Sequence, residues 1–211
     1  MGRVMLKYEA GEFGEGEIYI ERIFEAMRAA PPGPTPEYAY NALVTAYVSR
    51  ITGVTEHLDA ALSAGMTVVS SPAAVPLIAN LARIGLSPIA ALRNDAVAAQ
   101  ENYDFFKAQR GTMYFDFSVD RLLGLLAQAM GRVEDATAHF DDALTFCRKA
   151  GYRPELAWAC CDYVDLLRDR DAEGDRAKAI SLLDESLSIS SELGMRPLME
   201  RVLSRREILK A

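Results

Sequence analysis

A short segment of this chain occurs twice. Gly151-Tyr152-Arg153-Pro154 returns 43 residues later as Gly194-Met195-Arg196-Pro197, and residues 135–144 ahead of the first copy align with residues 178–187 ahead of the second. A fixed period of this length is typical of stacked helical repeats, in which each unit packs only against its neighbours. The period therefore predicts an all-α chain, and we expect a right-handed superhelix of about five antiparallel helical hairpins.

Composition favours a folded chain with a sizeable core. Half of the residues are apolar and a quarter are charged, which is too apolar for disorder. The net charge is −7, and the only basic stretch, Arg201 with Arg205 and Arg206, is too short to neutralise a phosphate backbone. We therefore expect no direct contact with nucleic acid.

The sequence also bears on where the protein acts. It contains no apolar run of about 20 residues, so we expect no membrane span and no membrane partner. Residues 1–9 become charged too early for a signal peptide. The three cysteines, Cys147, Cys160 and Cys161, are an odd number, which is typical of reduced thiols. These features together predict a cytoplasmic protein.

Prolines and glycines mark the expected ends of helices. Proline suits the first position of a helix, where its missing N–H would be unpaired anyway, and the prolines expected there are Pro36, Pro72, Pro88, Pro154 and Pro197. Glycine ends helices because it adopts the left-handed conformation readily, and the glycines expected to do so are Gly53, Gly65, Gly85, Gly111, Gly131, Gly151 and Gly194.

Helical periodicity between these marks predicts ten helices. Their approximate bounds are 17–30, 36–52, 55–64, 72–84, 88–110, 118–130, 133–150, 154–169, 175–193 and 197–210. Residues 68–69 and 113–115 are β-like, but they are too short to predict a strand.

We expect a single repeat domain over residues 1–211, with divergent repeats in 1–110 and clearer repeats plus a terminal helix in 111–211. The first predicted helix lacks an upstream partner and the last lacks a downstream partner. The chain is therefore expected to be a fragment of a longer protein, the alternative being a complete protein with irregular caps.

Residues 117–150 resemble a tetratricopeptide repeat (TPR). The positions that carry the resemblance follow the family's order and spacing, and they are Leu123, Gly124, Gly131, Ala136, Phe140 and Ala143. Further repeat positions are Gly151, Pro154, Ala179, Leu183, Gly194 and Pro197. In this packing Gly124 is expected to let Ala136 approach while Phe140 fills the space between hairpins. The chain departs from the family at Asp120, Ala127 and Ser186, where Trp, Tyr and Ala are usual.

The longer repeat unit and the closing residues 192–201 are similar to the C-terminal repeat regions of large bacterial signalling proteins, and this resemblance covers residues 90–210. Those proteins carry a nucleotide-binding ATPase module with either a cyclase domain or a LuxR-type helix-turn-helix. The resemblance implies a non-catalytic regulatory domain that senses a peptide, protein or small ligand and controls attached modules in signal transduction or transcription. The alternative is a scaffold or oligomerisation module without sensing, in which terminal helices pack against a second copy as a homodimer.

In the TPR family the first helix of each hairpin lines a concave groove that contacts partners. Carried across by position, Arg121, Gln128 and Asp162 are expected to face this groove. Tyr40 and Tyr47, seven residues apart in one predicted helix, belong either to the same surface or to the core.

No pattern in the sequence predicts an enzyme or a cofactor. The glycine-rich residues 11–16 lack the Lys-Ser/Thr pair of a phosphate-binding loop. His57 and His139 are far apart in sequence, and we expect no metal site, with His139 at the surface or the boundary of its helix.

Two further patterns are expected to be structural. Cys160 and Cys161 are adjacent, so they point about 100° apart on a helix and are expected to be small buried side chains rather than a redox pair. Asp162, Asp165 and Asp169 are expected to form a solvated acidic face, with contact to a cation or a basic peptide as the alternative.

Overall fold

The computed structural model describes residues 2–210 and confirms the all-α class. Among these residues there are eleven α-helices, one 3-10 turn and one hairpin of two very short strands. The chain divides into two compact units, Met1–Arg93 and Asn94–Ala211, and each is described on its own. The division between the units lies just before α6 (Ala96–Phe106).

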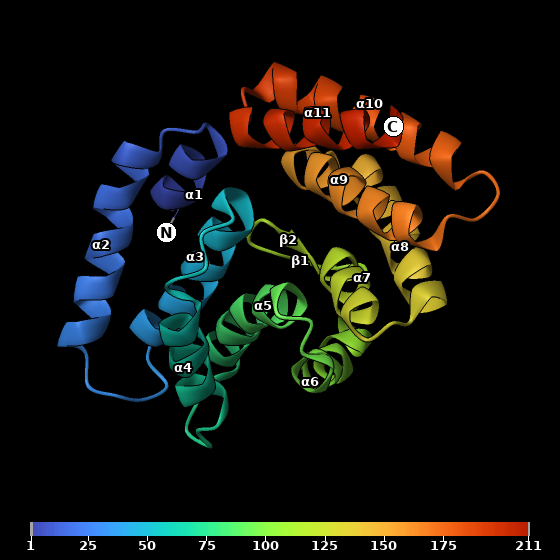
Figure 1. The fold of residues 1–211 in the computed structure, drawn as a ribbon. Helices are drawn as coiled ribbons and strands as arrows, with labels where there is room; N and C mark the ends of the chain where they lie inside the picture. The colour runs from blue at the N-terminus through green and yellow to red at the C-terminus, as the bar shows by residue number, and fades with distance from the viewer. Residues whose placement is uncertain (1, 211) are drawn as a thin grey trace. The chain divides into compact units, whose positions relative to one another are not determined.

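The first unit contains five helices, four of which pack around the fifth (Figure 1). In chain order they are α1 (Gly2–Glu9), α2 (Phe13–Ala29), α3 (Pro36–Thr52), α4 (Leu58–Val69) and α5 (Pro76–Leu92). Helix α3 packs against all four others, and it is buried along most of its length. The sequence analysis did not predict α1, which packs against α2, so the expectation that helix 17–30 lacks a partner is wrong.

Two glycines of the first unit lie inside helices, where the sequence analysis expected helix ends. A Cβ added to Gly85 of α5 would lie 2.5 Å from the backbone carbonyl carbon of Ala42 in α3. A Cβ at Gly65 of α4 would lie 2.7 Å from Leu86 Cδ2. These glycines therefore allow close helix packing.

Two of the five prolines also do not start helices. Helix α5 begins at Pro76 rather than Pro72, and it continues through Pro88 to Leu92. The predicted helices 72–84 and 88–110 are accordingly wrong. The actual break lies at residues 93–95, where the side chain of Asp95 accepts hydrogen bonds from the N–H groups of the first turn of the next helix.

The second unit contains the repeat. Its elements are α6 (Ala96–Phe106), the 3-10 turn η1 (Lys107–Gln109), β1 (Met113–Tyr114), β2 (Phe117–Ser118), α7 (Val119–Ala129), α8 (Val133–Ala150), α9 (Arg153–Arg170), α10 (Asp175–Leu193) and α11 (Arg196–Lys210). Strands β1 and β2 pair antiparallel, with Tyr114 opposite Phe117.

Helices α7 to α11 each pack against the next one in the chain, and α9 also contacts α7 and α11 (Figure 1). Contact between consecutive and alternate helices is the order expected of stacked hairpins. Gly131, Gly151 and Gly194 follow α7, α8 and α10 with positive φ, as predicted for glycines that end helices. Pro154 and Pro197 stand at the second residue of α9 and α11, one position later than predicted.

The repeat positions on helix interiors are buried, and they are Leu123, Gly124, Ala136, Phe140, Ala143, Ala179 and Leu183. Gly124 permits a close contact, but its nearest neighbour differs from the expected Ala136. A Cβ at Gly124 would meet three ring atoms of Phe140 at 3.1 Å. The Phe140 ring in turn stacks on Tyr163 at a centroid distance of 5.1 Å.

Candidate functional site

Helix α7 carries two consecutive buried charges that serve different neighbours. Asp120 and Arg121 are 2% and 3% exposed. Because consecutive helical residues point about 100° apart, Arg121 reaches α9 while Asp120 lies beside α8. We call Arg121 with Glu155 and Asp162 the arginine cluster, and Asp120 with His139 and Asp142 the histidine cluster.

The arginine cluster ties α7 to two turns of α9. Arg121 Nε donates a hydrogen bond to Asp162 Oδ2 at 2.8 Å, and its Nη1 donates to Glu155 Oε2. The other Glu155 oxygen accepts from the backbone N–H of Ser118 at 2.7 Å. Glu155 and Asp162 are each 3% exposed, so the whole cluster is buried.

Two carboxylates and one guanidinium leave the arginine cluster with excess negative charge when all three are ionised. Burial raises the pKa of Glu155 to about 7, although Arg121 opposes this shift. Burial also disfavours the charge of Arg121, but Glu155 and Asp162 outweigh that effect and hold its pKa above the ordinary value. Glu155 is therefore the group of this cluster that can take up a proton near neutral pH.

A second arginine–aspartate pair continues the contacts to α11. Arg205 Nε donates to Asp165 Oδ1 at 2.8 Å across α11 and α9. The pairs Arg121–Asp162 and Arg205–Asp165 join residues 41 and 40 positions apart, close to the sequence repeat. Both separations are near the 43-residue repeat because each pair joins alternate helices, α7 to α9 and α9 to α11.

The only tryptophan of the chain lies beside this row of pairs. The guanidinium carbon of Arg121 is 5.8 Å from the Trp158 ring centroid, and that of Arg201 on α11 is 5.1 Å from it. Distances below about 6 Å allow a cation–π attraction. Trp158 therefore adds a second link between α7, α9 and α11.

The structure brings together two of the predicted groove residues. Arg121 and Asp162 are side by side, but they are buried and bonded to each other, so they are not presented to a partner as expected. Gln128 is half-buried near the end of α7. Glu155 was not among the predicted site residues. It stands near the start of a predicted helix, where its sequence position does not distinguish a buried glutamate from a surface one.

The two tyrosines belong to the other unit. Tyr40 is half-buried on α3. Tyr47 is buried and its hydroxyl donates a hydrogen bond to Glu9 Oε1 of α1, which confirms the core alternative for this residue.

The acidic stretch of α9 is not one solvated face. Asp162 is buried with Arg121, Asp165 is half-buried with Arg205, and Asp169 is exposed. The prediction is therefore right for Asp169 alone, because arginines on α7 and α11 cover the other two.

The cysteines are buried, as predicted for Cys160 and Cys161. Burial raises the pKa of the Cys147 and Cys161 thiols to about 12, and it also raises the pKa of the Cys160 thiol. The thiols are thus protonated at neutral pH, which makes them weak nucleophiles.

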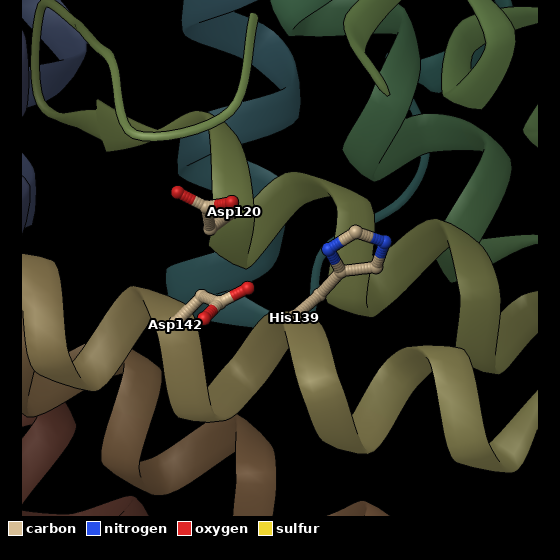
Figure 2. A group of neighbouring side chains, drawn as sticks. All are labelled: Asp120, His139 and Asp142. Carbon is tan, nitrogen blue, oxygen red and sulfur yellow. The ribbon is translucent and has the colours of Figure 1, made fainter. Parts of the chain in front are cut away.

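The histidine cluster joins α7 to α8 (Figure 2). One ligand atom from each of Asp120, His139 and Asp142 lies within 4.8 Å of the other two. His139 is 5% exposed, which corrects its predicted place at the surface or boundary. The i, i+3 spacing of His139 and Asp142 in the sequence indicates that they share one face of a helix. Nothing in the sequence places either residue beside Asp120.

Three neighbours complete the surroundings of the histidine cluster. The Tyr103 hydroxyl is 2.8 Å from His139 Nε2, and the Gly111 N–H donates to Asp120 Oδ2 at 2.7 Å. Arg110 bonds Asp142 and lies 3.7 Å from Asp120 Oδ1. Burial lowers the pKa of His139, with Arg110 acting in the same direction, and burial raises the pKa of Asp120.

Among residues 2–210, no helix is both long enough and apolar enough to cross a membrane. No model of a known protein family, no curated protein and no solved structure matches this chain.

Proposed function

We propose that this chain is a non-catalytic, TPR-like regulatory module that binds a protein or peptide partner on the face formed by α7, α9 and α11. The observation that carries the proposal is the row of two arginine–aspartate pairs, Arg121–Asp162 and Arg205–Asp165, that joins these three alternate helices. In this proposal the three helices are the first helices of successive hairpins, and they line the concave side of a right-handed superhelix.

The buried part of the row suits a regulatory element better than a purely structural one. Replacing a buried ion pair by apolar side chains is often neutral or stabilising, so such a pair is weak support for stability. What Arg121 does provide is one specific register of α7 against α9. A partner that prefers one arrangement of the helices would shift the population of arrangements, and attached modules would respond.

The wider role follows the resemblance of residues 90–210 to repeat regions of bacterial signalling proteins. The module would act in the cytoplasm, next to an ATPase module with a cyclase domain or a LuxR-type DNA-binding domain in the same polypeptide. The net charge of −7 favours a protein or peptide partner over direct contact with nucleic acid.

Contact with the partner would use exposed residues of α9 rather than the buried cluster. Arg168 is exposed near the end of α9, where it pairs with Asp169 and lies 3.7 Å from Asp165 of the row. Lys149 is a matched control, since it is an exposed cation near the end of α8, a second helix in the proposed hairpins.

The test places a photo-crosslinking amino acid at position 168 or at position 149 of the full chain in its native cells. We expect one discrete adduct from position 168 and none from position 149. With the purified partner, Arg168→Glu should weaken binding and Lys149→Glu should not. Equal adducts from both positions, or none from position 168, would refute the proposed face.

The scaffold alternative rests on the apolar side chains that α11 exposes, Leu203 and Ile208. Light scattering of the purified chain distinguishes it from partner sensing. A tight dimer that forms without any ligand and is lost in Leu203→Ser would favour the scaffold function. A monomer would leave the partner-binding proposal in place.

A further inference from the structure

We propose that Asp120, His139 and Asp142 bind one divalent transition metal ion, with zinc the best match. The proposal concerns the histidine cluster and does not depend on the partner-binding face. Each residue offers one ligand atom, and the three atoms already lie within 4.8 Å of one another. An imidazole among the ligands favours zinc and its neighbours, whereas magnesium and calcium prefer oxygen ligands alone.

Each of the two buried ligands has one atom in a hydrogen bond and one atom without a hydrogen bond. His139 Nε2 is held by the Tyr103 hydroxyl, and Asp120 Oδ2 by the Gly111 N–H. His139 Nδ1 and Asp120 Oδ1 are buried and have no hydrogen-bond partner. Buried polar atoms are nearly always hydrogen-bonded. An imidazole nitrogen and a carboxylate oxygen that lack hydrogen bonds in one cluster are suitable ligands for a cation, and among the ion pairs of residues 2–210 the only positive charge near them is Arg110 Nε, 3.7 Å from Asp120 Oδ1.

The hydrogen bonds outside the cluster have the arrangement of a metal site's supporting shell. A metal-bound histidine usually donates its other ring N–H to an oxygen, which fixes the tautomer and the ring orientation. In the tautomer where Nε2 donates to Tyr103, the lone pair is on Nδ1. Figure 2 shows the side of the ring that carries Nδ1 turned toward the two carboxylates.

Asp142 is the ligand that can move. It follows His139 by three residues on α8, and its side chain is 47% exposed. In a tetrahedral zinc site with bonds of about 2.0–2.2 Å, ligand atoms lie ~3.4 Å apart. A rotation of the Asp142 side chain would close the cluster to this spacing. Three protein ligands would leave the fourth position to water.

Arg110 is the cation that balances the cluster without metal. Its guanidinium bonds Asp142 and lies 3.7 Å from Asp120 Oδ1, and its side chain is 53% exposed. A divalent ion would neutralise both carboxylates, whereas one guanidinium neutralises only one of them. We therefore expect Arg110 to compete with the metal and to turn toward solvent when the ion binds.

The test is calorimetric titration of the chelator-treated full chain with Zn²⁺ and with Co²⁺ under reducing conditions. We expect one ion per chain. Asp142→Asn should weaken binding by about tenfold or more, as loss of a ligand or its support does. Arg110→Gln should tighten binding, because it removes the competing cation.

Asp141→Asn is the matched control. It removes the same charge from the adjacent residue, which pairs with Lys178 rather than with the histidine cluster. Its zinc affinity should equal that of the unmodified chain. Circular dichroism of all three variants checks that they are folded.

Three results would overturn the metal site. They are no stoichiometric binding of either ion, an Asp142→Asn affinity equal to that of the unmodified chain, and a thiolate charge-transfer band in the Co²⁺ complex, which would assign the ion to cysteine. An Arg110→Gln variant that binds metal more weakly would refute the competition and show that Arg110 supports the ion instead.

Discussion

At the scale of single residues, small differences in space and burial decide what each side chain does. A methyl group on Gly124 would lie 3.1 Å from the ring of Phe140, which would have to shift although it is fully buried and stacked on Tyr163. Glu155 is held between Arg121 and the Ser118 N–H with no access to water. Both residues lead to predictions that can be measured on the chain alone.

Gly124→Ala is expected to destabilise the protein by about 1–3 kcal/mol, because a buried, stacked ring cannot yield to the added methyl group. Denaturant unfolding followed by circular dichroism measures the change. Gly14→Ala in α2 is the control, since a Cβ there meets nothing within 4 Å and should be neutral or mildly stabilising. Equal stability of Gly124→Ala and the unmodified chain would refute the close packing of Phe140.

The contribution of Glu155 to the stability of the second unit should fall as pH rises from 5.5 to 8. The folded-state pKa of Glu155 is raised to about 7 from an ordinary value of 4.5, mainly by burial. The folded state therefore holds a proton that the unfolded state releases, and this contribution is lost as pH passes the folded pKa. The loss is at most about 2 kcal/mol, from 1.36 kcal/mol per pKa unit.

Glu155→Gln resembles the protonated form and should remove this pH dependence. Urea unfolding followed by the fluorescence of Trp158, which lies in the second unit, measures both proteins at each pH. An identical pH dependence of the unmodified chain and Glu155→Gln would assign the effect to other groups.

At the scale of helices, glycine and proline determine where a helix begins or ends only where packing against neighbouring helices does not oppose them. Helices α3, α8 and α10 have the predicted bounds 36–52, 133–150 and 175–193. Each of these helices ends at a glycine with positive φ, a conformation that glycine adopts without help from neighbouring helices. Helix α5 shows the opposite case, because Gly85 and Pro88 lie inside it, where packing against α3 outweighs local preference.

The arginine cluster leads to a prediction about how two helices are joined. Arg121→Met alone should cost about 3–5 kcal/mol, because it leaves two buried carboxyl groups, Glu155 and Asp162, without their counterion. The triple variant Arg121→Met, Glu155→Leu, Asp162→Leu should recover most of this loss or exceed the original stability. Thermal unfolding measures both variants. A triple variant no more stable than Arg121→Met would show that the cluster itself stabilises the pair of helices.

At the scale of the whole molecule, the chain divides into two compact units. The first is arranged around α3, and the second is the stack from α6 to α11. Proline and glycine mark helix ends in both units, so these local signals do not indicate where one unit ends and the next begins. The two units differ in which helices contact each other. The apolar periodicity of a single helix does not specify these contacts.

Residues 94–211 expressed alone should therefore fold and unfold cooperatively. A domain with its own core buries its apolar surface without help from a neighbour. The expected result is a single thermal transition, with the Trp158 emission maximum of the full chain. A gradual transition with red-shifted emission would show that this unit needs the first one.

The sequence by itself determined the all-α class, the ends of the repeat helices and the spacing of the repeat. These follow from proline, glycine and apolar periodicity, which act over a few residues. Only the tertiary structure decided that Arg121 is buried with Asp162, 41 positions away, and that Asp120 of α7 joins His139 and Asp142 of α8. The physical reason is that a charged side chain is either exposed to a partner or buried in an ion pair, depending on which residues pack over it. Those residues belong to a neighbouring helix, so the sequence of its own helix does not reveal them.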